Sequence, residues 1–273
     1  MKFFIYKGTG GLFHNLKGLS RAIQLSIEYQ AILIIDMKIH RAFGGNFNDY
    51  FTLVSNELEY YDNYEKVPKE LIENVKTKNA KFFGYLNKCI TENSLGFSSA
   101  YRIDEEKDVN VLYGPCNVNL SKIIKVNNQY FNNITSNNLP IKENYISVHF
   151  RNTDKKNEID NFYLEIEKSV KKYNIYTLYL ATDDYSFYEN IHTKFPELQL
   201  IQKTQPLQNV KNLHYGTDNP KKQMYECLQD VYYILLSHVF IPSRNSSFSQ
   251  CIIEMINKEF TIFPDVISKT IIE

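Results

Sequence analysis

The sequence predicts an α/β protein built on parallel sheets, and two patterns support this prediction. The first 36 residues read as strand, glycine-rich turn, helix and strand, and the part after residue 140 alternates short apolar runs with helical repeats of apolar residues. Such alternation is typical of parallel sheets with helices on both faces. The 273 residues are enough for two domains of moderate size, and we place their boundary near Pro140, at the end of a polar segment.

The opening strand–helix–strand unit contains a candidate phosphate-binding turn. Residues 3–6 are apolar, Gly10 and Gly11 lie in the turn that follows, and apolar residues recur at helical spacing over residues 12–27. Residues 31–36 then predict a strand buried on both faces. Glycines at the start of a helix let an anion approach the free N–H groups there. An ordinary tight turn is the alternative, because the glycine spacing differs from the dinucleotide-binding fingerprint.

Residues 37–140 show a less regular pattern than the rest of the chain. We expect a helix over residues 66–87, a charged loop over 102–110, and a strand followed by a turn over 111–115. No motif in this part indicates a particular chemistry.

The C-terminal half is organised around a strand and the polar residues that follow it. Apolar and polar side chains alternate over residues 146–151, so His149 and Arg151 project together at the carboxyl end of the strand. In an open α/β sheet, ligands bind at that end. A guanidinium there suits a diphosphate, because arginine can donate two parallel hydrogen bonds to one phosphate. The alternative is an ion pair between Arg151 and Asp154 that closes the strand.

Further helices and strands are expected to alternate after this strand. Helices are predicted over 162–173, 186–195, 223–237 and 252–256, and strands over 177–182, 198–201, 239–242 and 260–263.

Two of these strands end in polar residues that could bind a ligand. Asp183 and Asp184 could bind ribose or the edge of a base, although Asp184 could equally cap the next helix. Ser246 and Ser247 could hold a phosphate, with Ser249 as a plain helix cap as the alternative. On the helix over 223–237, Asp230 lies beside the apolar stripe, where it could reach a base or face solvent.

Composition indicates a soluble protein of the cell interior. Apolar residues make up 43% of the chain and charged residues 23%, and 31 basic residues balance 31 acidic ones. A net charge of zero gives no electrostatic case for binding nucleic acid. We find neither a secretory signal nor a transmembrane segment, and the four cysteines and six histidines lack metal-site spacing. We therefore expect a cytoplasmic protein without a metal site.

Ordered motifs in this sequence resemble those of the fucosyltransferase superfamily. Residues 148–155, Val-His-Phe-Arg-Asn-Thr-Asp-Lys, and residues 179–184, Tyr-Leu-Ala-Thr-Asp-Asp, are similar to motifs of the core α1,6-fucosyltransferases and the related nodulation fucosyltransferases. The block from Asp230 to the Asn-Ser-Ser-Phe-Ser run at 245–249 resembles a third motif, and is especially similar to that of bacterial α1,2-fucosyltransferases. The glycine-rich loop over 10–16 is also similar to the loop near the N-terminus of that superfamily.

The resemblance implies a GT-B-like α/β fold in which two Rossmann-like domains face a cleft. The domain over 1–140 would be the acceptor side, and the domain over 141–273 would bind the GDP-sugar. The implied reaction is an inverting, metal-independent transfer of fucose from GDP-fucose to a hydroxyl of a glycan or glycoconjugate, with no cofactor. A different nucleotide sugar and a non-catalytic nucleotide-sugar-binding protein are the alternatives.

The resemblance also implies roles for individual residues. Arg151 would stabilise the departing GDP, and Asp154, Lys155 and Glu158 would fall in the catalytic neighbourhood, with Glu158 or Asp154 accepting the proton. The donor would be bound by Gly10, Gly11, Asn15, His149, Asp183, Asp184, Asp230, Ser246, Ser247 and Phe248. Two departures stand out: Asn152 replaces the second arginine of the family's pair, and the family's acidic base lies one position away from Glu158.

Overall fold

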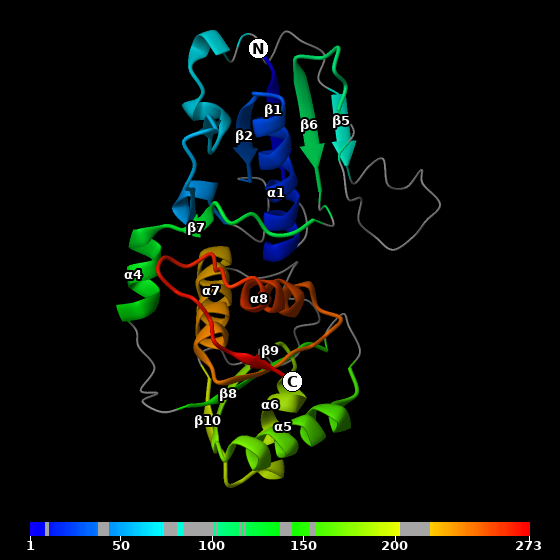
Figure 1. The fold of residues 1–273 in the computed structure, drawn as a ribbon, viewed down its shortest axis with the longest axis vertical. Coiled ribbons are helices and arrows are strands. Elements are labelled where there is room, and N and C mark those ends of the chain that lie inside the picture. Colours follow the sequence, from blue (N-terminus) through cyan, green and yellow to red (C-terminus); the bar gives the residue numbers. More distant parts are fainter. Residues whose placement is uncertain are drawn as a thin grey trace. The chain divides into compact units, whose positions relative to one another are not determined.

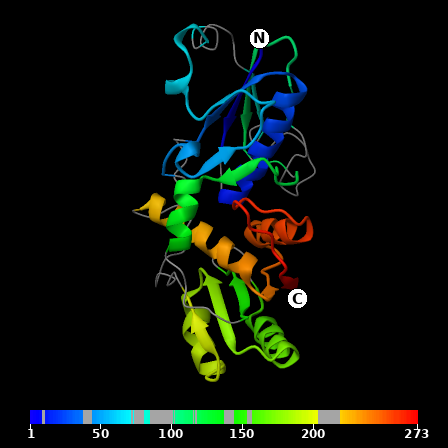
Figure 2. The ribbon, with the colours of Figure 1, turned by 60° about the vertical axis from the view of Figure 1, so that its left-hand side comes forward.

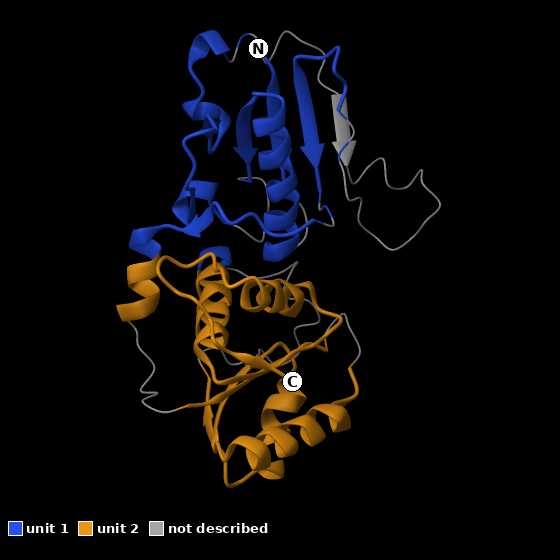
Figure 3. Ribbon diagram, viewed as in Figure 1, with its two compact units in different colours: residues 1–130, 219–221 blue, residues 131–218, 222–273 orange. Residues whose placement is uncertain are grey.

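The structure is a computed structural model that describes most of the chain (Figure 1). The described residues are 1–8, 11–37, 44–71, 73, 81–84, 101, 103–114, 116, 118–136, 144–152, 157–202 and 219–273. They divide into two compact units, which we call unit 1 (residues 1–130 with 219–221) and unit 2 (residues 131–218 with 222–273) (Figure 3). The domain boundary expected near Pro140 lies outside the described residues and stays a prediction.

Unit 1 is built on a parallel sheet with the strand order β4-β2-β1-β6-β5. Strand β1 lies in the middle, where Phe3 pairs with Ile32 on one side and Val109 on the other. The strands of this sheet are β1 (Phe3–Lys7), β2 (Ile32–Asp36), β4 (Tyr60–Tyr61), β5 (Lys81–Gly84) and β6 (Val109–Tyr113).

The remaining elements of unit 1 surround this sheet. Helix α1 (Leu12–Glu28) packs on β1 and β2, and a small antiparallel pair joins β3 (Phe51–Leu53) to β7 (Ile124–Val126). Short 3-10 helices are η1 (Phe47–Asp49) and η2 (Tyr64–Lys66), while α4 (Asn128–Ser136) contains residues of both units.

A glycine in α1 allows this helix to pack directly on its neighbours. A Cβ atom at Gly18 would lie 2.5 Å from the carbonyl oxygen of Gly114 and 2.6 Å from the hydroxyl of Tyr6. Both distances are shorter than real Cβ atoms tolerate, so a larger residue would push α1 away from the sheet.

Unit 2 is built on a second parallel sheet with the order β10-β9-β8-β11-β12. The chain runs outward from β8 through β9 to β10, and then returns to the other side of β8. The carboxyl ends of β8 and β11 are therefore a topological switch point, where doubly wound folds bind ligands. The strands are β8 (Ile146–Phe150), β9 (Thr177–Thr182), β10 (Gln199–Ile201), β11 (Val239–Ile241) and β12 (Ile271–Ile272).

Helices cover both faces of this sheet. Helices α5 (Ile159–Tyr173) and α6 (Tyr185–Lys194) lie on one face, and α7 (Pro220–Leu236) and α8 (Ser247–Asn257) lie on the other (Figures 1 and 2). The apolar side chains of β8 pack in a core with Phe162 and Ile166 of α5 and Phe187 of α6. The polar side chains of β8 consequently face α7 and α8.

Two sequence-based expectations were wrong. The helix expected over 66–87 includes β5, where Phe82 and Phe83 follow the preference of aromatic residues for strands. The strand expected over 260–263 does not form, and the last strand is β12. Ile262 and Phe263 are buried beside a turn in which the Phe263 N–H donates to the Thr261 hydroxyl. A short apolar run predicts burial, but it cannot distinguish a strand from a buried turn.

Candidate functional site

The polar face of β8 is covered by Ser237, which directly follows α7, and by Ser249 of α8. The Ser147 and Ser237 hydroxyls are hydrogen-bonded at 2.8 Å, and Nδ1 of His149 lies 2.7 Å from the Ser249 hydroxyl. All four residues are buried. The polar side chains of Ser147 and His149 are thus satisfied within the protein. The residues that could bind a ligand are therefore those after the carboxyl end of the strand.

His149 is a neutral, packed imidazole. Its ring centroid lies 4.6 Å from that of Phe248. Burial, together with the charge of Arg151, lowers the pKa of His149 to about 3. The ring is therefore uncharged at physiological pH, and it can take part in hydrogen bonds and stacking but not in charge pairing.

Arg151 is held at the switch point by groups from several elements. Its backbone N–H donates to the hydroxyl of Ser243, at 2.9 Å, and its carbonyl accepts from the Asn157 side-chain amide. Its Nε atom lies 3.9 Å from Oδ2 of Asp183. The side chain of Arg151 is 16% exposed, so the guanidinium is partly desolvated while it stays within reach of a ligand. The alternative partner Asp154 lies outside the described residues.

The two aspartates that follow β9 have different surroundings. Asp184 is the N-cap of α6 and accepts hydrogen bonds from the Phe187 N–H at 2.8 Å and the Ser186 hydroxyl at 2.6 Å. This geometry is the cap that we gave as the alternative role of Asp184. Asp183 instead accepts from the backbone N–H of Asn152 at 3.0 Å and faces Arg151.

The N-terminus of α8 lies at the carboxyl end of β11. Ser246 is its N-cap residue and makes no capping hydrogen bond with its side chain, while its N–H donates to the carbonyl of Ser243. The first N–H groups of α8, from Ser247 and Phe248 onward, therefore form a positive helix end. Ser249, expected as a possible cap, is bound to His149 instead.

Helix α7 contributes an acidic group with an unusual pKa. Asp230 is half-buried and accepts a hydrogen bond from the Tyr179 hydroxyl at 2.6 Å. Burial raises the pKa of Asp230 to about 7, against the effect of that bond and with help from the charge of Glu226. The nearby thiol of Cys227 has its pKa raised to about 12 by burial and by Asp230, and lowered in part by Arg151. The charges of Asp230 and Arg151 thus both act on one residue of α7.

In unit 1, the glycine-rich turn leads into α1. Gly11 is the N-cap of α1, and its carbonyl accepts from the side-chain amide of Asn15 at 3.0 Å. Asn15 is fully buried, and a Cβ atom at Gly8 would lie 2.3 Å from its Oδ1 atom. Asn15 therefore packs against the turn. Gly10 lies outside the described residues.

The other predicted catalytic residues are placed only in part. Asp154 and Lys155 lie outside the described residues. Glu158 is exposed at the start of α5, where it accepts from the Asn161 side chain at 2.7 Å. The structure thus brings His149 and Arg151 together with the aspartates after β9, the start of α8 and Asp230. The Glu158 side chain instead accepts its hydrogen bond from α5.

Sequence reasoning missed several residues that support this cluster. Ser243 and Asn157 hold Arg151, and Tyr179 holds Asp230. An ion pair within unit 1 was also missed: Lys7 lies 3.1 Å from Asp36 where β1 and β2 end. Ser243 and Asp36 could have been noticed, because each stands at or just after the end of a predicted strand. Lys7 likewise follows the predicted strand over 3–6, and Tyr179 opens one of the motifs quoted above, whereas nothing in the local sequence marks Asn157.

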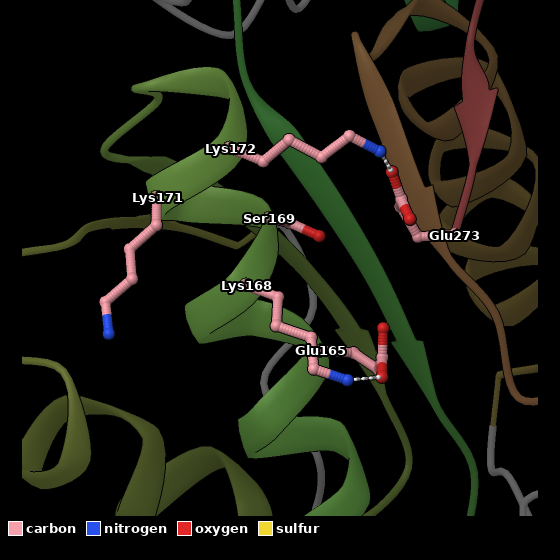
Figure 4. A pocket seen from close by; sticks show the side chains of 6 residues that line it. All are labelled: Glu165, Lys168, Ser169, Lys171, Lys172 and Glu273. Atoms are coloured by element: carbon pink, nitrogen blue, oxygen red, sulfur yellow. Dashed lines mark hydrogen bonds and ion pairs between the residues drawn. The ribbon is translucent and has the colours of Figure 1, made fainter.

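A separate hollow lies on the exposed surface of α5 (Figure 4). Its lysines are paired: Lys168 lies 2.9 Å from Glu165, and Lys172 lies 2.7 Å from Glu273. Arg244 also donates to the carbonyl of Glu273. Because the charges are balanced and α5 lies on the face of the sheet away from α7 and α8, this hollow is a solvated surface feature and not the candidate site.

Among the residues that the structure describes, no cluster of three or more histidine, cysteine, aspartate or glutamate side chains could hold a metal ion. The described helices also include none that is both long and apolar enough to cross a membrane.

No family model and no curated protein matches this sequence, but solved structures match its fold. The chain is similar to the fucosyltransferase NodZ from Bradyrhizobium, with a TM-score of 0.59 and 14% identity over 92% of this chain and 91% of that one. It is also similar to POFUT1 in complex with GDP-fucose, with a TM-score of 0.64 and 10% identity over 99% and 97% of the two chains. The GT-B-like α/β fold class is thereby confirmed, and the resemblance that the motifs indicated extends to the fold.

Proposed function

We propose that this protein is a glycosyltransferase that transfers fucose from GDP-fucose to a hydroxyl of a glycan or glycoconjugate. One observation carries the proposal: Arg151 and the N-terminus of α8 meet at the switch point of a doubly wound sheet, and the chain has the fold of structures that hold GDP-fucose. A guanidinium and a helix N-terminus together favour a diphosphate.

The donor would extend across the carboxyl end of the unit 2 sheet. The diphosphate would accept hydrogen bonds from Arg151 and from the N–H and hydroxyl groups of Ser246 and Ser247. The guanine would lie toward Asp230, whose carboxylate can accept from the base N–H groups, with neutral His149 near the nucleoside. The resemblance assigns Gly10 and Gly11 to the diphosphate as well, and Asn15 donates its side-chain amide to the Gly11 carbonyl.

The reaction would be a direct displacement at the anomeric carbon. The acceptor hydroxyl attacks C1 of fucose, the bond from C1 to the β-phosphate oxygen breaks, and GDP leaves with the bonding electrons, which inverts the configuration. Arg151 and the α8 helix end would stabilise the growing negative charge without a metal ion, and Lys155 could add to this stabilisation. Asp154 or Glu158 would accept the proton of the hydroxyl.

We expect the reaction to take place in the cytoplasm. The described cysteines form no disulfide, and Cys116 and Cys251 are buried, which suits a reducing compartment.

Thermal unfolding in the presence of EDTA tests the donor. At a ligand concentration of 100 times Kd, specific binding should stabilise the native state by about 2.7 kcal/mol and raise the midpoint by roughly 5 to 10 °C. We expect this shift with GDP and GDP-fucose but not with UDP or UDP-sugars. No shift with any nucleotide would contradict the proposal.

Substitution of Arg151 tests the chemistry. Arg151→Ala should lower turnover by about 10²- to 10³-fold, because it removes a cation from the departing phosphate. Lys168→Ala, which removes one exposed cation from α5, is the matched control and should retain full activity. Near-normal turnover in Arg151→Ala would show that this arginine does not stabilise the leaving group.

Asn152 favours one alternative, a glycosyltransferase that uses a different nucleotide sugar, because the family's second arginine is missing at this position. A midpoint shift with another nucleotide sugar, such as GDP-mannose, would support that alternative. Binding without transfer to any acceptor would instead favour a non-catalytic nucleotide-sugar-binding protein.

A further inference from the structure

Asn152 has partners on two sides. Its backbone N–H donates to Oδ1 of Asp183 at 3.0 Å, and its Nδ2 atom donates to Oδ2 of Asp184 at 2.7 Å. Its Oδ1 atom accepts from the backbone N–H of Asn157 at 3.2 Å. Asn152 thus connects the end of β8 by hydrogen bonds to the turn after β9 and to Asn157, just before α5.

Two of these partners also hold Arg151. Oδ2 of Asp183 lies 3.9 Å from Nε of Arg151, while Oδ1 of the same carboxylate binds Asn152. Asn157 donates its side-chain amide to the Arg151 carbonyl. The side chain of Asp183 is only 8% exposed, so solvent competes little with either contact. Arg151 is therefore held on its side-chain and main-chain sides by residues that Asn152 also binds.

Asp184 gives this arrangement a fixed anchor. It caps α6, and its own N–H donates to the Thr182 hydroxyl at 3.0 Å. Burial opposes the ionisation of Asp184, but hydrogen bonds from Ser186, Asn152 and the Phe187 N–H hold its pKa below the usual value. The group is therefore a carboxylate at neutral pH, and its bond with Asn152 is charge-assisted.

The side chain of Asn152 is uncharged, and this matters for the orientation of Arg151 as much as its hydrogen bonds do. A cation at position 152 would pair with the carboxylates of Asp183 and Asp184 itself. The side-chain amide instead donates to Asp184 alone, while Asp183 is bound by the backbone N–H of residue 152. Neither bond adds a positive charge, so the charge of Asp183 is left to orient Arg151.

We infer that Asn152 is a positioning residue that sets the direction of the Arg151 guanidinium without touching the donor. The inference rests on the proposed function, in which Arg151 stabilises the departing diphosphate. Paired hydrogen bonds from arginine depend strongly on angle, and the charge that they stabilise is largest in the transition state. Loosening Asn152 should therefore lower turnover more than donor binding.

Kinetics of the full chain test the inference. The reaction to follow is hydrolysis of GDP-fucose, in which water replaces GDP at C1, because it requires no knowledge of the acceptor. Asn152→Ala should lower kcat about tenfold to a hundredfold and change KM by less than about threefold. Asn152→Asp keeps the acceptor for Asn157 but loses the donor to Asp184, and should be impaired at least as much.

A second arginine variant separates positioning from a general structural role. In an Arg151→Lys background the directional guanidinium is gone, so adding Asn152→Ala should lower kcat by less than about threefold further. An equal loss in both backgrounds would mark a structural role and overturn the inference.

A ligand-free measurement keeps the inference testable even if the proposed donor is wrong. The chain has five arginines, so the Nε–Hε resonances are few, and the Arg151 signal can be identified by its loss in Arg151→Lys. Asn152→Ala should increase the fast motion of this N–H bond, whereas Lys168→Ala should not. Unchanged order of Arg151 in Asn152→Ala would overturn the inference. A wild type that neither binds nor hydrolyses GDP-fucose would refute the proposed function and leave this readout intact.

Discussion

Donor affinity should rise with pH, because Asp230 titrates near neutrality. Its pKa is about 7 in the ligand-free protein, mainly as a result of burial. In the proposed complex the carboxylate accepts from N–H groups of the base, and a protonated acid would place its own O–H hydrogen where an acceptor is needed. Only the ionised form should therefore bind the donor.

The expected slope follows from this pKa. If only the carboxylate binds, the apparent Kd is multiplied by about 11 at pH 6 and about 1.1 at pH 8, which is a tenfold change in affinity or about 1.4 kcal/mol. His149, with a pKa of about 3, and Cys227, with a pKa of about 12, titrate outside this range. Folding stability of the ligand-free protein should change in the opposite direction. The pKa of Asp230 is raised on folding from 3.8, so its contribution to the free energy of unfolding falls as pH rises from about 4 to about 7.

Calorimetric titration of GDP-fucose at pH 6, 7 and 8 measures the slope. GDP itself is unsuitable, because its terminal phosphate titrates in the same range. Asp230→Asn, which keeps the shape of the side chain without its titration, is the matched control and should give an affinity that does not change with pH. A flat profile for the wild type, or the same slope in Asp230→Asn, would refute the role given to Asp230.

Three further predictions concern stability and donor binding. Gly18→Ala should lower the thermal midpoint, because its Cβ would lie 2.5 Å from the Gly114 carbonyl oxygen, at a cost of about 1–3 kcal/mol; an unchanged midpoint would show that α1 can shift freely. Asp184→Ala should lower the free energy of unfolding in urea by about 1 kcal/mol, because it removes the cap of α6. Asp184→Asn should retain most of the wild-type stability, because asparagine also caps helices well. Ser249→Ala should lower the free energy of unfolding by about 1 kcal/mol and weaken GDP-fucose binding, because it removes the hydroxyl bound to His149. Unchanged affinity in calorimetry would show that the His149–Ser249 pair does not contribute to donor binding.

Local patterns predicted much of the fold and of the candidate cluster. The alternation over residues 146–150 correctly placed the side chain of His149 on the polar face of β8, with Arg151 directly after the strand, because strand periodicity is a backbone property. The pattern could not indicate that Tyr179 supports Asp230, since this contact depends on how β9 and α7 pack together. The segment over 81–84 was misread for a related reason: its state depends on pairing with β6, which lies well downstream in the chain.

Among the described residues, those that bond to the polar face of β8 come from distant parts of the chain. The bonds of Ser147 to Ser237 and of His149 to Ser249 span 90 and 100 residues, and the bond from the Arg151 N–H, just after the strand, to Ser243 spans 92. Contacts of such long sequence separation form late in folding, because the intervening loop must be closed first. During synthesis, β8 would leave the ribosome long before its partners, and its polar side chains would stay hydrated until α8 had been made. We therefore expect the proposed donor site to form late in folding, so that a nucleotide that binds there would favour the final step.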